Sequence, residues 1–378
     1  MMSFRRKSPT SNIPQRNGTK PFLHGQTLVT SGLNELDMTL GGGLLLRTLN
    51  LVETTTLISA QDASSLDLSS RASDALSIDL LRYFVAEGVV DREQRVALVA
   101  PDAAGFINLQ LPLELSLAQS QVKQQLADKE DDVPLEIAWQ YGNVEQNRAN
   151  HSRRFCHSYD LSKSMHQEMV LANEPIAIDL TSVKTSTDVG AIAAYDHLYL
   201  AIENVVLKHE QNRVDQVLRI GILGLGSPEM GSTDAAHMRA LFIFFKRFRT
   251  LLCQSTNAVS LILVASDTLG AFPATFINEL RHVSDSVLTL NSFAGSRDLL
   301  TEELQAFQGS LMLRKLPRLH SLTCHAPSNA RFGIKRDPRK LRIEKFHLPP
   351  EGSRTNDKSK GCNSITPGSS SGHDLLAF

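Results

Sequence analysis

The fold of this 378-residue chain is constrained most by the stretch from Gly25 to Glu53, GQTLVTSGLNELDMTLGGGLLLRTLNLVE. The stretch predicts a short strand over 28–30, a tight turn and a short helix over 33–40. A glycine triplet at 41–43 then precedes an apolar strand over 49–52. This order indicates the first core strand of an α/β domain.

The segment before the triplet is similar to the one that introduces the first core strand in RecA/KaiC-type P-loop ATPases. The residues that carry this resemblance are Gly32, Leu33, Leu36, Asp37, Leu40 and the triplet itself. The resemblance implies a RecA-like fold.

The phosphate-binding part of such an ATPase is missing from the sequence. An active member continues into G-x-x-x-x-G-K-[ST], where backbone N–H groups close around phosphate, the Lys reaches the outer phosphates and the hydroxyl binds magnesium. Here the strand continues into Thr54, Thr55 and Thr56, and neither glycine nor lysine occurs before Asp74. The threonine hydroxyls and the dipole of the next helix offer an alternative anion site. The composition favours a loop that binds no nucleotide.

A second part of the ATPase site is missing as well. The apolar run 217–223 predicts a central parallel strand, which in RecA-like ATPases ends in a magnesium-binding Asp. Leu223 and Gly224 occupy that place here. We therefore expect no catalytic residue, no cofactor and no metal site, and no ATP hydrolysis by this chain alone.

Composition narrows the class of protein without identifying a ligand. A formal net charge of −1 does not by itself indicate nucleic acid. The four cysteines lie far apart with no C-x-x-C pair, which favours a reducing compartment over a zinc site or a disulfide framework. The amino end does not resemble a secretory signal, and no apolar run reaches membrane-spanning length. We expect a cytoplasmic and nuclear protein with no membrane partner.

The pattern predicts one RecA-like domain over 25–348, between a flexible basic arm over 1–24 and a disordered tail over 349–378. Insertions are expected over 57–73 and, where acids are frequent, over 119–134. Helices are expected over 74–87 (with Gly88 as its C-cap), 187–210, 235–252 and 276–283, and strands over 95–100, 155–161, 217–223, 259–265 and 286–291. From 309 the strands become antiparallel, over 310–315, 319–324, 332–335 and 341–347. The fold class is therefore α/β, a mostly parallel twisted sheet with helices on both faces and antiparallel C-terminal strands.

Several residues have both a structural and a functional interpretation. Trp139 is expected to pack rather than to stack on a base. A metal-ligand or Cys/His role for Cys156 and His157 is disfavoured, because neighbouring residues of a strand point to opposite faces. Arg239 and nearby cations face outward on their helix, where solvation, salt bridges and nucleic acid all stay open. The basic residues of 331–345 are explained by protection of a sheet edge.

The chain as a whole resembles the PAXNEB family of Elongator subunits, from Gly18 to His347. Beyond residues 32–43, the resemblance is carried by Ile137-Ala138-Trp139-Gln140-Tyr141, Tyr159-Asp160 with Ser162-Lys163, Leu218-Arg219-Ile220-Gly221-Ile222, Leu225-Gly226-Ser227-Pro228, Leu316-Pro317-Arg318-Leu319, Ile343-Glu344 and His347-Leu348-Pro349-Pro350. Generic RecA-like proteins share only residues 32–43, so the other motifs discriminate the family.

The resemblance implies a subunit that assembles with two related RecA-like subunits into a hetero-hexameric ring. That ring is an accessory part of Elongator, the complex that modifies wobble uridines (U34) in tRNA. The resemblance further implies that the ring binds tRNA and is linked to its ATP-dependent release, while carbon transfer occurs on the catalytic subunit of the Elongator core. The expected partners are the two related subunits, the core and tRNA, and the chain itself is not expected to be an enzyme.

Two other classes stay open from the residues alone. An active RecA/KaiC-like ATPase is disfavoured by the missing Lys and Asp. A DNA-recombination mediator is disfavoured because no helix–hairpin–helix or zinc element is visible in the sequence.

Candidate tRNA contacts follow from the fold class. In hexameric RecA-like rings, nucleic acid passes near the loops after the central strands, which here are 226–233 and 267–273. Neither loop contains Lys or Arg. We therefore expect Phe272 either to stack on an unpaired base or to pack as a core residue at the head of the next helix. Positive charge would come from Arg239 and Arg281 or from neighbouring subunits.

Overall fold

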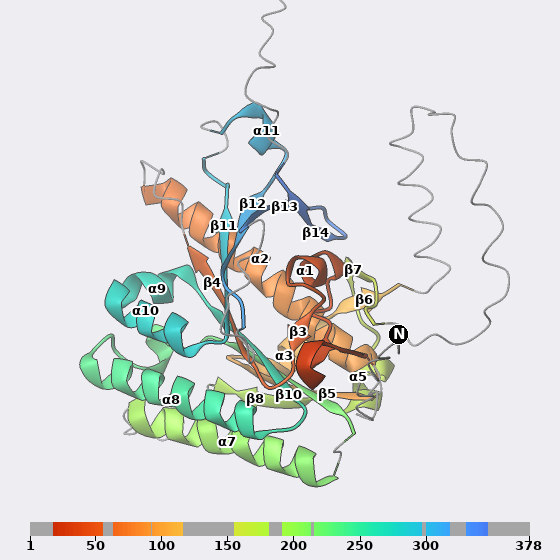
Figure 1. Cartoon of the computed structure of the whole chain (residues 1–378). Helices are drawn as coiled ribbons and strands as arrows, with labels where there is room; N and C mark the ends of the chain where they lie inside the picture. Colours follow the sequence, from red (N-terminus) through yellow and green to blue (C-terminus); the bar gives the residue numbers. More distant parts are fainter. Residues whose placement is uncertain are drawn as a thin grey trace, which may run out of the picture. The chain divides into compact units, whose positions relative to one another are not determined.

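A nine-stranded sheet forms the centre of the structure (Figure 1). The structure is a computed structural model that describes residues 18–55, 63–91, 93–115, 155–180, 191–212, 215–296, 300–317 and 330–346. The strands of the sheet are β4 (Leu49–Thr55), β5 (Gln94–Ala100), β8 (Ile176–Asp179), β9 (Val217–Leu223), β10 (Ala258–Val264), β11 (Ser286–Ser292), β12 (Gly309–Lys315), β13 (Arg331–Arg336) and β14 (Leu341–Lys345).

The strand order is β14-β13-β12-β11-β4-β10-β9-β5-β8. The six strands from β11 to β8 pair in parallel, whereas β12, β13 and β14 extend the sheet through antiparallel pairs. The order of β4, β5, β9, β10 and β11 requires crossover connections, which helices supply. The predicted α/β fold class, with a mostly parallel sheet and antiparallel C-terminal strands, is confirmed.

Helices cover both faces of the sheet (Figure 1). On one face α2 contributes Leu80, Leu81 and Phe84 to a core that includes Val52. On the other face α7, α8 and α10 pack over Leu49 and neighbouring strand residues. The helices are α1 (Asn34–Thr39), α2 (Ala63–Val90), α3 (Ala103–Gly105), α5 (Gln167–Asn173), α7 (Ala191–Asn212), α8 (Ala235–Gln254), α9 (Ser266–Ala271), α10 (Ala274–Val283) and α11 (Glu302–Gln305), with single turns η1 (Leu23–Gly25), η2 (Phe106–Gln110) and η3 (Pro228–Met230).

The parallel strands form because their sequences are apolar on both sides. Every residue of β10, AVSLILV, is buried, and six of the seven residues of β9 are buried. Strands covered by helices on both faces have such continuous apolar runs. Because this signal is strong, both strands lie where the sequence predicts them to within one residue.

The helix α2 is longer than expected. The helix predicted over 74–87 is part of a 28-residue helix that begins at Ala63, so the insertion expected over 57–73 is wrong from residue 63 onward. Its serines, which favour loops when considered locally, make tertiary hydrogen bonds instead. Ser69 Oγ donates to the Ser292 carbonyl at 3.1 Å, and Ser73 Oγ accepts from Ser292 N at 2.8 Å.

Gly88 lies inside α2 and does not cap it. A Cβ atom at this position would lie 2.5 Å from Val96 Cγ2 and 2.7 Å from Arg219 Cδ. The glycine therefore gives α2 the room to approach β5 and β9, and the helix continues for two more residues.

Other boundaries also differ from the prediction. Residues expected as a loop over 267–273 include the helix α9, and the edge strand β8 was not predicted. The expected arm over 1–24 includes the strand β1 (Thr19–Pro21), which pairs with β2 (Thr27–Val29). The predictions for Thr56, Trp139, 119–134, 319–324 and 349–378 lie outside the described residues.

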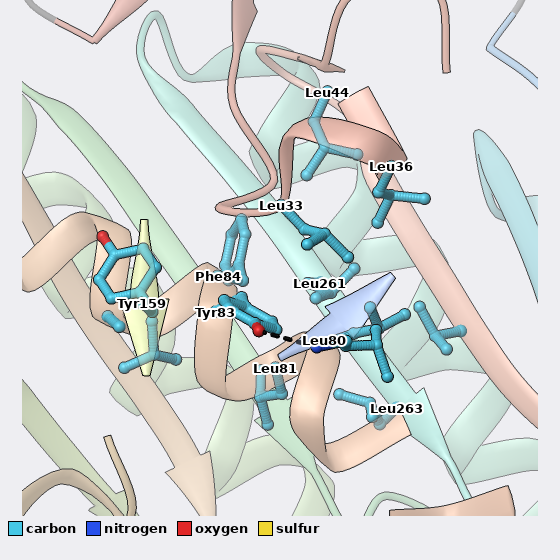
Figure 2. Packing of buried hydrophobic residues seen from close by; sticks show 14 of the residues in the cluster. Leu33, Leu36, Leu44, Leu80, Leu81, Tyr83, Phe84, Tyr159, Leu261 and Leu263 are labelled. Atoms are coloured by element: carbon cyan, nitrogen blue, oxygen red, sulfur yellow. Dashed lines mark hydrogen bonds between the residues drawn. The ribbon is translucent and has the colours of Figure 1, made fainter. Parts of the chain in front are cut away.

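The leading segment, residues 25–48, packs against α2. It contains β2 and β3 (Leu44–Leu45), which form a small antiparallel sheet with β1. A second small sheet pairs β6 (Pro112–Glu114) with β7 (Tyr159–Ser164). The strand predicted over 155–161 overlaps β7 only at 159–161, because β7 begins four residues later and continues to Ser164. Figure 2 shows Leu33, Leu36 and Leu44 of the leading segment beside Tyr83 and Phe84 of α2. These contacts join the leading segment to the main core.

The turn between β2 and α1 is closed by Asp37. Its carboxylate accepts hydrogen bonds from Ser31 N at 2.7 Å and from the Thr30 hydroxyl. Gly32, in the same turn, has φ +88°, and a Cβ there would lie 2.3 Å from the Tyr83 carbonyl oxygen. This geometry explains why Gly32 and Asp37 appear together in the sequence pattern.

A buried polar network lies under α2. Glu87, which is fully buried, accepts hydrogen bonds from Tyr159 Oη at 2.7 Å and from His157 N at 3.1 Å, and its Oε1 pairs with His157 Nδ1 at 2.8 Å. Arg219 of β9, also fully buried, donates to the Thr30 carbonyl at 2.8 Å and to the Gln94 side chain. The network connects β9, α2, the leading segment and β7.

Burial of Asp37 gives the fold a pH dependence. Burial raises the pKa of Asp37 to about 6, against hydrogen bonds from Thr30 and Ser31 that lower it. Because the unfolded carboxyl ionises near 3.8, folding is penalised progressively as pH rises from 4 to above 6, by up to about 3 kcal/mol. We expect the free energy of unfolding of Asp37→Asn, relative to that of the unsubstituted chain, to rise as the pH increases from 4 to above 6. Urea unfolding at pH 4, 5, 6 and 7 measures it, and a constant difference would contradict the assignment.

Candidate functional site

The residues that stand in the place of a P-loop lie at the carboxyl end of β4. This strand ends at Thr55, and α2 begins at Ala63. Thr54 is buried, and its hydroxyl donates to Asp74 Oδ1, which also accepts from Ser266 N at 3.3 Å. The Thr55 hydroxyl contacts the Asn291 side chain of β11. Both threonines are thus engaged by other residues of the chain.

The carboxyl group of Asp74 is not an ordinary exposed acid. Burial raises its pKa, and the nearby carboxylate of Asp267 raises it further, while hydrogen bonds from Thr54 and Ser266 act in the opposite direction. Ser70 of α2 contacts the Ser266 hydroxyl and donates to Asp267 Oδ1 at 3.1 Å. Hydroxyls and carboxylates fill this strand end, and neither Lys nor Arg is among these contacts.

The position of α2 is also unlike that of a P-loop helix. In a P-loop the helix begins at the strand end, so that its N-terminal N–H groups face the phosphate. Here Asp74 contacts the strand end, and 11 helical residues precede it. At 1.5 Å per residue, the first turn of α2 lies about 16 Å before Asp74 along the helix axis. Figure 1 shows this amino-terminal part of α2 extending past the end of β4. The helix dipole is therefore not directed at the strand end.

Arg281 neutralises a buried carboxylate. Its Nε lies 2.8 Å from Oε2 of Glu53, a residue with no exposed surface. Glu53 also forms an ion pair with Arg314, whose Nε lies 3.0 Å from Oε1, and accepts a hydrogen bond from the Thr289 hydroxyl at 2.6 Å. Because Arg281 is already paired inside the chain, the structure gives it a role in stability that the sequence does not reveal.

Phe272 lies in the core and not on a loop surface. Its side chain is 5% exposed, and its ring packs against the rings of His237 and Phe276, with centroid distances of 5.5 Å and 5.3 Å. Tyr195 Oη lies 2.9 Å from His237 Nε2 and accepts from Gly226 N at 3.1 Å. The ring of Phe272 is therefore not presented to an unpaired base, and its position does not support the predicted stacking.

Arg239 is the predicted tRNA contact that stays accessible. It lies on the exposed side of α8. Among the described residues it has no ion-pair partner. Arg247 and Arg249 on the same helix pair with Asp196 at 2.6 Å and Asp285 at 2.9 Å. The structure thus does not bring Arg239, Phe272 and Arg281 together as one surface.

His157 and Cys156 do not form a catalytic pair. His157 pairs with Glu87, as described above, and the Cys156 thiol faces the carbonyl of His157 at 3.5 Å. Burial alone would lower the pKa of His157, but the Glu87 carboxylate raises it overall, and His157 contributes to a lowered pKa of Glu87 despite its burial. Within the described parts of the chain, no three His, Cys, Asp or Glu side chains are grouped to hold a metal ion.

No helix in the described parts of the chain combines the length and the apolar character needed to cross a bilayer.

The chain is 30% identical to "Elongator complex protein 4" of Danio rerio, with 97% of this chain and 94% of that protein covered. It is 29% identical to the protein of the same name from Mus musculus, with 97% and 92% covered. Among solved structures, it is similar to the KaiC-like protein PH0186 from Pyrococcus horikoshii OT3, at 12% identity and a TM-score of 0.41, with 84% of this chain and 98% of that chain covered.

The family model described as PAXNEB protein matches residues 12–378. That match includes the leading segment, the sheet and the helices on both faces. It agrees with the motifs that distinguish this sequence from generic RecA-like proteins. The chain belongs to the PAXNEB family.

Proposed function

We propose that this chain is a non-catalytic RecA-like subunit of the accessory hetero-hexameric ring of Elongator. In that role it supports the binding and release of tRNA during wobble-uridine modification. The observation that carries the proposal is the similarity over nearly its whole length to relatives named Elongator complex protein 4, including 97% of this chain and 94% of the Danio rerio protein. Its partners are then the two related RecA-like subunits, the Elongator core and tRNA, in the cytoplasm and nucleus.

The non-catalytic part of the proposal is supported by the strand-end geometry. Asp74 accepts hydrogen bonds from both Thr54 and Ser266 where a P-loop would surround phosphate. Moreover, the sequence has no glycine or lysine between Thr54 and Asp74. Catalysis on another subunit is consistent with both observations.

The proposed role is tested by deleting the gene for this chain and measuring the modified nucleosides of tRNA by mass spectrometry. Loss of the side-chain modification at wobble uridines, restored by the tagged chain, is expected. The tagged chain should also co-purify with the other Elongator subunits. Normal wobble modification in the deletion strain would contradict the proposal.

The nucleotide prediction concerns the purified chain. We expect magnesium-ATP to leave its unfolding midpoint unchanged. A ligand at one hundred times its dissociation constant stabilises a fold by about 2.7 kcal/mol, so binding would be visible in a thermal scan. The assembled ring, measured in parallel, controls for sites completed by neighbouring subunits. A clear rise in the midpoint of the isolated chain would refute the prediction.

The tRNA prediction concerns Arg239. We expect Arg239→Ala in the assembled ring to flatten the plot of log affinity against log salt by about 0.7 to 0.9, the loss of one phosphate contact. Arg249→Ala is the matched control, because it removes an exposed arginine of the same helix that Asp285 already neutralises. Equal slopes for the two variants would argue against a phosphate contact at Arg239.

A further inference from the structure

A cavity of about 580 Å³ lies between the helix α2, the turn η2 and the strand β13. Small-molecule sites in proteins have volumes of about 300–1,000 Å³ and combine apolar walls with a few fixed polar groups. The walls of this α2–β13 cavity include three aliphatic and three charged side chains, those of Leu76, Ile78, Leu109, Asp79, Arg82 and Arg336. The cavity therefore has the size and the composition of a ligand site.

Asp79 holds the two guanidinium groups of the wall in place. Its side chain is buried, Oδ1 accepts from Arg82 Nη1 at 2.9 Å, and Oδ2 accepts from Arg336 Nε at 2.7 Å. Each guanidinium also donates to a backbone carbonyl, Arg82 to that of Gln110 and Arg336 to that of Asp337. The two arginine side chains are only 16% and 25% exposed. They are thus fixed parts of the wall and do not extend into water.

The positive charge of the wall is only partly neutralised. Two guanidinium groups share the single carboxylate of Asp79, so the lining residues carry one excess positive charge. Two further acids of this neighbourhood, Glu35 and Asp337, already pair with Lys340 at 2.7 Å and Arg342 at 3.7 Å. Arg336 donates through Nε and Nη1, and its Nη2 has no acceptor among the residues that the structure describes. One charge and its N–H groups are therefore available to an anion.

We propose that the α2–β13 cavity binds a carboxylate attached to a short apolar group. The planar guanidinium matches a carboxylate through parallel N–H groups, and the aliphatic wall would contact the carbon part of the ligand. A monoanion matches the single excess charge, whereas a phosphate monoester carries about two negative charges. The carboxylate belongs either to a free small acid or to the carboxyl terminus of a polypeptide, which present the same chemistry to the cavity.

The test titrates the full-length chain with hexanoate and measures binding by saturation-transfer NMR. Hexanamide, which has the same carbon chain but no charge, is the ligand control. Hexanoate is expected to bind with a dissociation constant on the order of 1 mM, and hexanamide about tenfold more weakly. Equal affinities of the acid and the amide, or no binding of the acid at millimolar concentration, would overturn the proposal.

Variants locate the binding in the cavity. Arg336→Gln should weaken hexanoate about tenfold and leave hexanamide unchanged, whereas Arg331→Gln, which removes an exposed arginine at the other end of β13, should affect neither. Unfolding midpoints check the fold, because Arg336 also neutralises Asp79. Leu109→Asp provides a second variant, since Leu109 is 69% exposed and tolerates a charge, and it should weaken hexanoate about threefold by repulsion. Unchanged affinity in folded Leu109→Asp, or equal effects of the two arginine variants, would contradict the proposal.

A competition experiment separates the two sources of the carboxylate. A tripeptide ending in leucine, with a free carboxyl terminus or as its amide, is added to the chain with hexanoate bound. Displacement by the peptide acid assigns the cavity to a polypeptide terminus, and displacement by 4-methylpentanoate alone assigns it to a small acid. Displacement by the peptide amide would show that a carboxylate is not required and would refute the proposal. These measurements use this chain alone, so their outcome is independent of the Elongator assignment.

Discussion

Replacement of Glu87 by Leu is expected to lower the free energy of unfolding by about 3–5 kcal/mol, because it breaks a buried charge network from one side. Glu87 has no exposed surface, and His157 and Tyr159 lose their hydrogen-bond acceptor when it is removed. Arg219, equally buried, loses the negative charge that favours its ionised form. Urea unfolding of the purified chain measures the effect.

The matched control for this variant is Glu93→Leu, which removes an exposed acid six residues away. It should change the stability by less than about 0.5 kcal/mol. The double variant Glu87→Leu/Arg219→Met should cost less than the sum of its single variants, since it removes both buried charges together. Additive costs would show that Glu87 and Arg219 are not coupled.

Gly32→Ala is expected to destabilise the chain by about 2–5 kcal/mol, although it adds only one methyl group. Gly32 has φ +88°, a conformation that costs an L-residue energy, and its new Cβ would meet the Tyr83 carbonyl at 2.3 Å. That carbonyl belongs to the backbone of α2, so the clash cannot be relieved by rotating a side chain. The leading segment and α2 would have to separate, and the contacts of Figure 2 would weaken.

Gly41→Ala separates the two causes of this cost. Gly41 has nearly the same backbone angle, φ +85°, but no atom lies within 4 Å of a Cβ built there. Its expected cost is the conformational part alone, about 1–2 kcal/mol. Equal losses for the two alanines would mean that the close approach to Tyr83 is unimportant.

The elements that the sequence predicts well are those whose own residues carry the signal. The strands β9 and β10 are apolar at nearly every position, and the stripe of α8 has helical spacing, so all three lie close to the predicted ranges. The antiparallel strands β13 and β14 also follow their pattern. In each case, the spacing of apolar residues within the segment itself predicts how the strand or helix is buried.

The elements predicted poorly depend on residues far away in the chain. The serines of α2 locally favour a loop. They are helical because Ser69 and Ser73 form hydrogen bonds with Ser292, and Ser70 contacts the Ser266 hydroxyl. Gly88 locally predicts a helix end. The structure shows that glycine is needed there because the Arg219 side chain lies too close for a Cβ atom. Long-range partners of this kind override local preference, and a single sequence does not reveal them.

The candidate site shows the same limit. The missing Lys and Asp of the ATPase motifs are visible in the sequence, but the pairing of Arg281 with Glu53 and the burial of Phe272 are not. A cation or an aromatic residue near a strand end gives the same sequence signal whether it contacts a ligand or packs within the protein. Only the position of Glu53 and His237 in space distinguishes them.

The contact between Thr54 and Asp74 has a consequence for how this subunit responds to the energy state of the cell. A ligand shifts a conformational equilibrium only through different affinities for its states. Here the chain's own hydroxyls and carboxylates occupy the strand end, so under the proposed non-catalytic role we expect the ratio of ATP to ADP to leave the conformation of this chain unchanged. In the hetero-hexameric ring proposed above, we expect such a subunit to keep one conformation whatever the neighbouring subunits bind.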